Sequence, residues 1–389
     1  MKDEKNIDLD AVQLEHIELL SKKIFDKPSK DIKYLLLTNY IHTQLLQEEL
    51  TRTGLYQWLN VFDGDVKYPR DVINYNDYDI VQINLSAQDV SLIGDVREVI
   101  EKNSKTKLIV NNDYTTEIWS KAFKFPTPIG RALRMADMIY GTEYFQATAV
   151  SELAERKCYV VPHPADIRRL KSLSRTPTKS IISTIWRRYD NHAYIPSLAV
   201  RNHGLTTQLI GYDKKLDPNF HVTTTLFDYV LAGTNYFDFC DQLRESRIVY
   251  DPFTYHSYSR TTVDTAALGI PVITSNRTQS GVLCYPHTVI DPYDVTAARQ
   301  LIKRLQEDKE FYKLVVDTAL ERSEFYNHSN SKERYLVALE DALANDVPKV
   351  KRVVKTELSR GIGDDVLDIT AQEINQNGKE ETDKGKGFK

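Results

Sequence analysis

The sequence predicts an α/β protein with two tandem domains, each built on a parallel β-sheet. Three observations indicate this fold class. Short apolar runs alternate with longer amphipathic stretches, a pattern typical of βαβ units. The alternation occurs in two series, separated by a polar stretch at 171–179. The 389 residues also suffice for two domains of ordinary size.

The first series predicts one Rossmann-like domain over residues 31–170. Its apolar runs predict strands at 34–38, 79–84, 107–111 and 138–140, and the segments between them predict helices at 41–53, 88–103 and 128–137. Before this series, apolar residues recur at helical spacing from 7 to 25, and Pro28 ends the pattern. We therefore expect residues 1–30 to form a leading helix.

The second series predicts another Rossmann-like domain over residues 171–325. Strands are expected at 180–185, 207–210, 247–250 and 271–274, and helices at 260–268 and 294–306. Residues 323–344 predict one or two further helices, so we assign 326–345 to a terminal helix. The tail at 346–389 is polar and charged, and its end at 375–389 is expected to be disordered.

Composition restricts the classes of function. The chain has 51 Lys and Arg against 55 Asp and Glu, a net charge of −4, so it has no overall field that would attract a polyanion. It has no apolar run of the roughly 18 residues that a membrane span needs, and its first thirty residues lack a signal-peptide pattern. Three widely spaced cysteines predict reduced core thiols. We expect a cytoplasmic protein.

The start of the predicted 260–268 helix is the first candidate site. Ser259, Arg260, Thr261 and Thr262 place hydroxyl groups and a guanidinium where a helix presents unsatisfied N–H groups, which is phosphate-binding chemistry. One turn later, Asp264 could accept hydrogen bonds from the diol of a ribose. The same spacing also fits a structural role, with Ser259 as N-cap and Asp264 as a partner of the helix dipole.

A second candidate lies in the loop after the predicted 180–185 strand. Arg187 and Arg188 follow Trp186 there and could clamp a diphosphate, although each could equally be a solvated loop charge. Adjacent strands of one parallel sheet would direct this loop and the 260 helix toward the same crevice.

The string from Arg260 to Ser275 resembles the donor-site motif of the retaining, nucleotide-sugar-dependent glycosyltransferases with the GT-B fold (glycosyltransferase group 1, family 4-like). Asp264 stands at the later of the two acidic positions in that motif, and the motif's alanine, glycine, proline, valine and isoleucine are matched by Ala267, Gly269, Pro271, Val272 and Ile273. His256 stands at the earlier acidic position. Asp251 resembles the family's acidic residue before Pro-Phe.

The resemblance extends over roughly 33–345, and outside the donor motif it is looser. Segments 136–143 and 160–166 are similar to family elements near the end of the first domain. The glycine-rich acceptor loop of the family is not visible at 38–43. After the fourth strand, where many relatives have a histidine, this chain has Asn111-Asn112-Asp113-Tyr114.

The resemblance implies two Rossmann-like domains facing a central cleft and transfer of a sugar from a nucleotide-sugar donor to an acceptor hydroxyl, as in a hexosyltransferase, with retention. It implies no cofactor, no metal and no protein nucleophile, with Arg187, Arg188 and Arg260 neutralising the leaving diphosphate. Asp113 is a candidate near the acceptor, and His256 is a candidate imidazolium near the donor phosphate. None of His42, His163, His192 and His256 forms a His/Asp pair with metal-ligand spacing, and the stretches 183–192 and 256–264 contain no Asp-x-Asp pair.

The acceptor and the reaction class have alternatives. The acceptor could be a glycan, a lipid-linked sugar or another hydroxyl compound. A phage-type transferase acting on a DNA base would need a basic groove, for which the first domain offers a modest cluster, Lys121, Lys124, Arg131 and Arg134. A non-catalytic GT-B-like scaffold or glycan-binding protein would explain the missing acceptor-loop glycines and His256.

Overall fold

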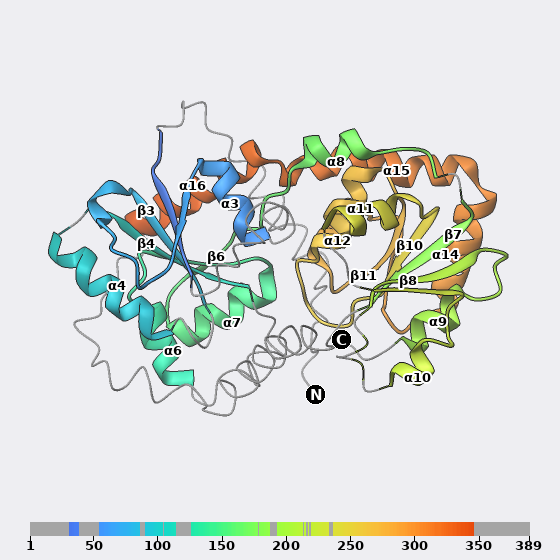
Figure 1. Ribbon diagram of the computed structural model, residues 1–389, viewed down its shortest axis with the longest axis horizontal. Helices are drawn as coiled ribbons and strands as arrows, with labels where there is room; N and C mark the ends of the chain where they lie inside the picture. Colours follow the sequence, from blue (N-terminus) through green and yellow to red (C-terminus); the bar gives the residue numbers. More distant parts are fainter. Residues whose placement is uncertain are drawn as a thin grey trace, which may run out of the picture.

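The computed structural model describes residues 31–38, 54–85, 90–103, 105–113, 126–177, 179–186, 193–212, 214, 217, 219–232 and 236–345. These residues form two six-stranded sheets, both parallel throughout. The sheets lie side by side in Figure 1, the first in blue and teal, the second in green and yellow.

The first sheet has the strand order β2-β1-β3-β4-β5-β6. Its strands are β1 (Tyr34–Leu37), β2 (Asp65–Lys67), β3 (Ile80–Asn84), β4 (Lys107–Asn112), β5 (Met138–Gly141) and β6 (Cys158–Val160). All four residues of β1 are buried, Leu35 and Leu37 on one face and Tyr34 and Leu36 on the other. Burial on both faces is expected for a parallel sheet that helices cover on both sides.

Helices cover both faces of this sheet. On one face, α4 (Val90–Asn103), α6 (Pro126–Leu133) and α7 (Tyr144–Ala154) pack against Leu35, Val81 and Val110. On the other face, α3 (Gly54–Phe62) places Trp58 and Phe62 over the sheet. A short 3-10 helix, η2 (Tyr75–Asp77), precedes β3.

The second sheet has the strand order β12-β11-β10-β7-β8-β9. Its strands are β7 (Ile181–Ile185), β8 (Thr206–Tyr212), β9 (Tyr229–Ala232), β10 (Ile248–Asp251), β11 (Val272–Ser275) and β12 (Val289–Ile290). The chain winds outward from β7 to β9, then returns to place β10 on the other side of β7. The carboxyl ends of β7 and β10 therefore flank a topological switch point, where open α/β sheets bind ligands.

The helices of the second half follow the strands. They are α8 (Ile167–Leu173), α9 (Tyr194–Val200), α10 (Phe220–Thr223), α11 (Tyr236–Arg244), α12 (Arg260–Leu268), α13 (Gln279–Cys284), α14 (Val295–Glu307) and α15 (Lys309–Ser323), with a 3-10 helix η4 (Glu324–Tyr326) after α15. Helix α12 is buried along most of its length and packs against α8 and α15, so it lies at the centre of this half.

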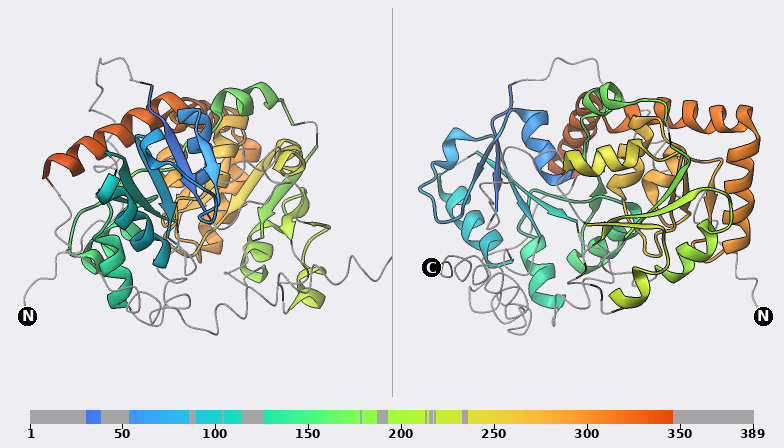
Figure 2. Two further views of the ribbon diagram at one scale, coloured as in Figure 1. Left: turned by 60° about the vertical axis from the view of Figure 1, so that its left-hand side comes forward. Right: turned by 45° about the vertical axis from the view of Figure 1, so that its right-hand side comes forward.

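The last described helix returns to the first sheet. Helix α16 (His328–Asn345) lies beside α3, as the orange and blue ribbons of Figure 2 show. The ring centroid of Tyr335 on α16 lies 4.8 Å from that of Trp58, and Tyr335 donates a hydrogen bond to Gln82 in β3. The two segments that connect the halves also meet, because the Ala165 N–H donates to the Tyr326 carbonyl at 2.7 Å.

The sequence-based elements are confirmed where the structure describes them. The eight predicted strands correspond to β1, β3, β4, β5, β7, β8, β10 and β11, and the predicted 260–268 helix is α12. The helix expected at 128–137 ends early, because Asp137 accepts a hydrogen bond from the Leu108 N–H and so begins the pairing of β5 with β4. The helices expected at 7–25 and 41–53 and the tail lie outside the described residues.

Candidate functional site

Helix α12 begins next to the switch point of the second sheet. The loop that joins β10 to α12 ends at Ser259, whose φ of 48° lies in the left-handed region. Ser259 occupies the N-cap position but makes no side-chain capping bond, and its hydroxyl donates to Asp251 Oδ2 at 3.3 Å. Gly269 ends the helix with a φ of 72°. The first turn of α12 therefore keeps a positive dipole end that no side chain caps at Ser259.

Arg260 and Asp264 lie one helical turn apart on α12 and form an ion pair, with 2.7 Å between Arg260 Nε and Asp264 Oδ1. The two side chains are only 14% and 2% exposed. The Tyr236 hydroxyl donates to the same carboxylate oxygen at 3.0 Å, and Arg260 Nη1 donates to the Pro164 carbonyl at 3.0 Å. The pair is thus anchored to α11 and to the segment between the two sheets.

The charge of this pair changes the acidity of its neighbours. Burial disfavours the charged form of Arg260, but Asp264, Tyr236 and Tyr258 outweigh that effect and raise the pKa of the guanidinium. Burial and the Asp264 carboxylate raise the pKa of the Tyr236 hydroxyl well above its usual value. The start of α12 therefore holds a permanent cation paired with the Asp264 carboxylate, and the neutral phenol of Tyr236 on α11 lies beside the pair.

A cleft of about 340 Å³ lies between the two halves and includes the start of α12. Its second-half wall is lined by Trp186, Tyr236 and the α12 residues Ser259, Arg260, Thr261 and Asp264. The opposite wall comes from the first sheet and its helices, with Gly54, Asp113, Thr142, Gln146 and His163. Five residues expected from the sequence, Asp113, Ser259, Arg260, Thr261 and Asp264, thus come together in one cavity.

His163 lines the wall of the cleft that comes from the first sheet, and it is 2% exposed. Its Nδ1 accepts a hydrogen bond from the Trp58 indole N–H at 3.2 Å, and its Nε2 lies 3.3 Å from Asp113 Oδ1. The carbonyl of His163 accepts from the Tyr258 hydroxyl at 2.8 Å. Gly54 permits this packing, because a Cβ at that position would lie 2.4 Å from the His163 Cβ.

Two expected donor-site residues do not line this cleft. The Thr262 hydroxyl is fully buried and bonds to Ser280 and to the Ser259 carbonyl, so it holds the loop together instead of facing a ligand. His256 packs on Phe145 with 3.9 Å between ring centroids, in a position outside the lining of the cleft. Arg187 and Arg188 lie outside the described residues, although the strand that leads to them ends at the cleft.

Sequence reasoning missed His163 and Tyr236 as site residues. His163 is buried, as a core histidine would be, but its ring also lines the cleft. The partner that orients it, Trp58, is 105 residues away, so no local spacing could reveal the contact. Tyr236 reaches Asp264 from a separate helix for the same reason.

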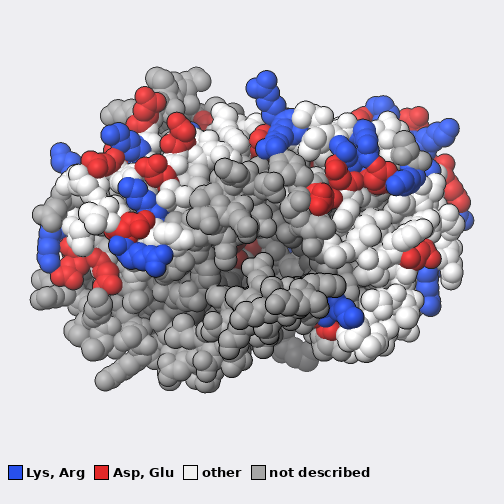
Figure 3. Space-filling view, in the orientation of Figure 1, with Lys and Arg blue, Asp and Glu red and all other residues white. Residues whose placement is uncertain are grey.

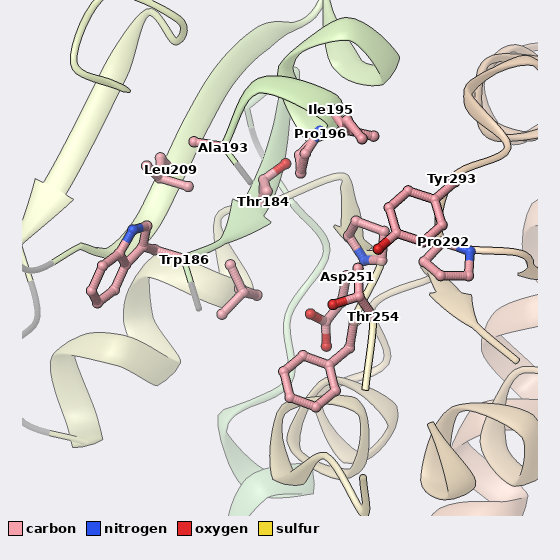
Figure 4. Close-up of a pocket in the computed structure, with 13 residues that line it drawn as sticks. Thr184, Trp186, Ala193, Ile195, Pro196, Leu209, Asp251, Thr254, Pro292 and Tyr293 are labelled. Carbon is pink, nitrogen blue, oxygen red and sulfur yellow. The ribbon is translucent and has the colours of Figure 1, made fainter. Parts of the chain in front are cut away.

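A smaller apolar pocket of about 30 Å³ adjoins the ends of β7 and β10. Figure 4 shows Trp186 and Leu209 on one side of it and Pro292 and Tyr293 on the other, with Asp251 and Thr254 between them. Aromatic and proline side chains make up much of its lining. This pocket and the cleft share Ile185 and Trp186, so a single ligand could extend across both.

The surface charges are mixed. Figure 3 shows Lys and Arg interspersed with Asp and Glu over the described part of this face, without a continuous basic stripe. Arg134, one of the residues considered for a basic groove, lies 3.6 Å from Glu155, and Lys121 and Lys124 lie outside the described residues. Within the described ranges, no three His, Cys, Asp or Glu side chains converge as metal ligands. No described helix is long and apolar enough to cross a membrane.

Comparison with known proteins identifies the fold. No protein-family model and no curated protein sequence matches the chain. Among solved structures, Anabaena HepE in complex with UDP and glucose matches with a TM-score of 0.58 and 13% identity, covering 80% of this chain and 100% of HepE. Sucrose-phosphate synthase from Thermosynechococcus elongatus matches with a TM-score of 0.56 and 12% identity, covering 80% of this chain and 99% of that one.

A third match is an alpha-glucosyltransferase in complex with UDP and DNA containing an HMU base. Its TM-score is 0.56 at 14% identity, and the match covers 79% of this chain and 99% of that chain. These likenesses over about four-fifths of the chain and the two parallel sheets define the class: the chain has the GT-B fold, which confirms the fold expected from the sequence.

Proposed function

We propose that the protein is a glycosyltransferase that moves a sugar from a nucleotide-sugar donor to an acceptor hydroxyl, with the nucleotide bound on the second half of the chain. One observation supports this more than any other. The ion pair of Arg260 and Asp264 lies at the start of α12, at the switch point of the second sheet, and lines a cleft whose opposite wall comes from the first sheet. The fold likeness to HepE, which was solved with UDP-glucose, supports the same donor class.

Each part of the donor has a proposed place. Asp264 accepts hydrogen bonds from the ribose, and the α12 N-terminus with Ser259, Arg260 and Thr261 faces the diphosphate. Arg187 and Arg188, which directly follow the cleft residue Trp186, would add two cations to the diphosphate. The base would lie beside Trp186, which lines both the cleft and the adjoining apolar pocket.

The proposed reaction depends on stabilising the leaving diphosphate as the glycosidic bond breaks. Arginine side chains and a helix N-terminus can supply this stabilisation without a divalent ion and without a cofactor. The pKa of Arg260 is raised, so this side chain is a cation at every physiological pH. The transfer proceeds with retention, the acceptor hydroxyl entering from the first-sheet side near Asp113. Turnover is expected to survive EDTA, and its complete loss with rescue by Mg²⁺ would contradict the metal-free form of the proposal.

The acceptor that we propose is a glycan, a lipid-linked sugar or another hydroxyl compound. A modified DNA base is a second candidate, because one match is a transferase solved with DNA. The mixed charge in Figure 3 and the Arg134–Glu155 contact favour the first group, since binding of a duplex requires several phosphate contacts. The cytoplasm is the proposed location, in keeping with three buried free cysteines.

A thermal-shift panel of nucleoside diphosphates and nucleotide sugars tests the proposal. A ligand at a hundred times its Kd adds about 2.7 kcal/mol to stability, which is readily measured. Donor hydrolysis by the same preparation separates an enzyme from a scaffold or glycan-binding protein. A shift without hydrolysis in the presence of candidate acceptors would favour the non-catalytic alternative, and no shift with any nucleotide would contradict the proposal.

A further inference from the structure

The cleft wall that comes from the first sheet includes the imidazole of His163. A hydrogen bond from the buried Trp58 determines which nitrogen of that ring carries the proton. The Trp58 indole can only donate a hydrogen bond, and its N–H points at His163 Nδ1 at 3.2 Å. Nδ1 therefore accepts and has no proton of its own. Trp58 is fully buried and packed by Tyr335 and Tyr140, with ring centroids at 4.8 and 6.3 Å, so it cannot turn away. The single ring proton of His163 is consequently on Nε2.

His163 Nε2 is a donor that the described protein atoms leave unused. It is buried, and no acceptor among the described residues meets it with hydrogen-bond geometry. The nearest one is Asp113 Oδ1, 3.3 Å away, whose side chain is 42% exposed. Both side chains line the cleft. An unpaired buried donor costs about 1 to 3 kcal/mol in general, so at a cavity wall it is completed by water or by a ligand that displaces the water.

The chemistry of the pair selects the ligand group. A donor N–H and a carboxylate acceptor stand side by side, so the group between them must accept from the first and donate to the second. A carbonyl or phosphate oxygen could accept the hydrogen bond from His163, but it has no proton to donate to the Asp113 carboxylate. An ammonium group could donate to Asp113, but it has no lone pair with which to accept the hydrogen bond from the His163 N–H. Water satisfies both partners at once, and among ligand groups a hydroxyl can take its place.

We propose that His163 and Asp113 jointly bind one hydroxyl group of the sugar carried by the nucleotide, and that Trp58 positions His163 for this contact. The inference rests on the proposed function, because the same cavity contains Asp264 and Arg260 on its opposite wall. His163 is thus a specificity-determining residue, and Trp58 is a positioning residue that acts through it. The pair discriminates sugars by a hydroxyl, since a sugar lacking it leaves both buried partners unsatisfied.

The binding test compares UDP-glucose with UDP by calorimetry on the full chain. Met at position 163 removes the donor, whereas Gln places an amide N–H near the position of Nε2. We expect His163→Met to lower the affinity ratio of UDP-glucose to UDP about tenfold while leaving UDP affinity unchanged, and His163→Gln to retain most of the ratio. Equal changes for both ligands, or an unchanged ratio in His163→Met, would overturn the proposal but leave the proposed function standing. Failure of the wild type to bind any nucleoside diphosphate or nucleotide sugar would contradict both.

A second measurement needs no substrate. The imidazole ¹⁵N shifts of the wild type distinguish the two ring tautomers, and the His163 signal among the nine histidines is identified by its loss in His163→Gln. We expect the Nε2–H tautomer in the wild type and a mixture of tautomers in Trp58→Phe, which keeps a ring but lacks the indole N–H. An Nδ1–H tautomer in the wild type, or identical shifts in Trp58→Phe, would overturn the role assigned to Trp58.

Discussion

Arg260 Nε and Asp264 Oδ1 are 2.7 Å apart within one turn of α12, in a pair that is almost entirely removed from solvent. The same guanidinium donates to the Pro164 carbonyl in the segment that joins the two halves of the fold. Removing one member leaves the other as a buried charge, a loss of about 3 to 5 kcal/mol in comparable pairs. Variants of this pair must therefore be tested for folding before their binding is interpreted.

Asp264→Asn should weaken UDP binding about 10- to 100-fold. The substitution keeps the shape of the side chain but removes the charged acceptor proposed for the ribose, a contact worth about 1.5 to 3 kcal/mol. Calorimetry with UDP on a variant shown by circular dichroism to be folded is the measurement. Asp241→Asn is the matched control, because Asp241 is 55% exposed and pairs with Arg244 on α11. Unchanged UDP affinity in Asp264→Asn would assign Asp264 a purely structural role.

Arg260→Gln should reduce affinity for UDP more than affinity for uridine. A charge-assisted contact to the diphosphate is absent when the ligand is the nucleoside, so only UDP loses it. Arg187→Gln and Arg188→Gln should behave in the same way, and Lys303→Gln, at a position 68% exposed on α14, should change neither affinity. Competition binding measures, for each variant, the loss of affinity for UDP and the loss of affinity for uridine relative to wild type. Equal losses for the two ligands would place these arginines away from the phosphates.

The sequence predicted the fold well because the fold depends on local patterns. The run 181–185 and the segment ending at Gly269 are predictable from apolar periodicity and from the glycine that a left-handed helix end requires. The strands it missed gave weak signals: β2, β6 and β12 have three, three and two residues, and β9 is half exposed, so neither length nor alternation marks them.

The candidate site was predictable in part. Ser259, Arg260, Thr261 and Asp264 share one short segment, so helical spacing brings them together and the sequence shows it. The contact between Trp58 and His163 joins residues from α3 and from the link after β6, and only the folded chain creates it. His256 was chosen from motif alignment, but its ring stacks on Phe145 instead, because a motif position does not fix where a side chain points.

Gly54→Ala should lower stability and disturb the His163 wall. A Cβ at Gly54 would meet His163 Cβ at 2.4 Å and His163 Cδ2 at 2.6 Å, so the ring must move. Overpacking of this kind costs about 1 to 3 kcal/mol. Urea unfolding measures the loss of stability. Gly204→Ala is the control for backbone strain without a steric clash, because Gly204 has a φ of 69° and open space around it. A Gly54→Ala protein with wild-type stability and an unchanged imidazole spectrum would contradict the packing described for this wall.

Asp341 should make the docking of α16 sensitive to acid. Hydrogen bonds from Lys157 and Tyr159 lower the pKa of the Asp341 carboxyl. Because this pKa lies below the unfolded value of about 3.9, the stabilisation is fully present above that value and is lost as pH falls through the folded one. The side chain is 34% exposed, so the effect is small, about 0.5 to 1 kcal/mol. Urea unfolding of wild type and Asp341→Asn should differ at pH 7, and the difference should shrink as the pH falls below the unfolded value and through the folded pKa. A difference independent of pH would contradict this assignment.

Release of nucleoside diphosphate from a nucleotide sugar tests the proposed activity most directly. Purified full-length protein is incubated with UDP-glucose and related donors, with and without candidate acceptors, and the released diphosphate is quantified. We predict release from at least one donor, nearly abolished by Asp264→Asn and unaffected by Asp241→Asn. No release from any donor by protein that is folded, or release that Asp264→Asn leaves unchanged, would contradict the assignment of this cleft to glycosyl transfer.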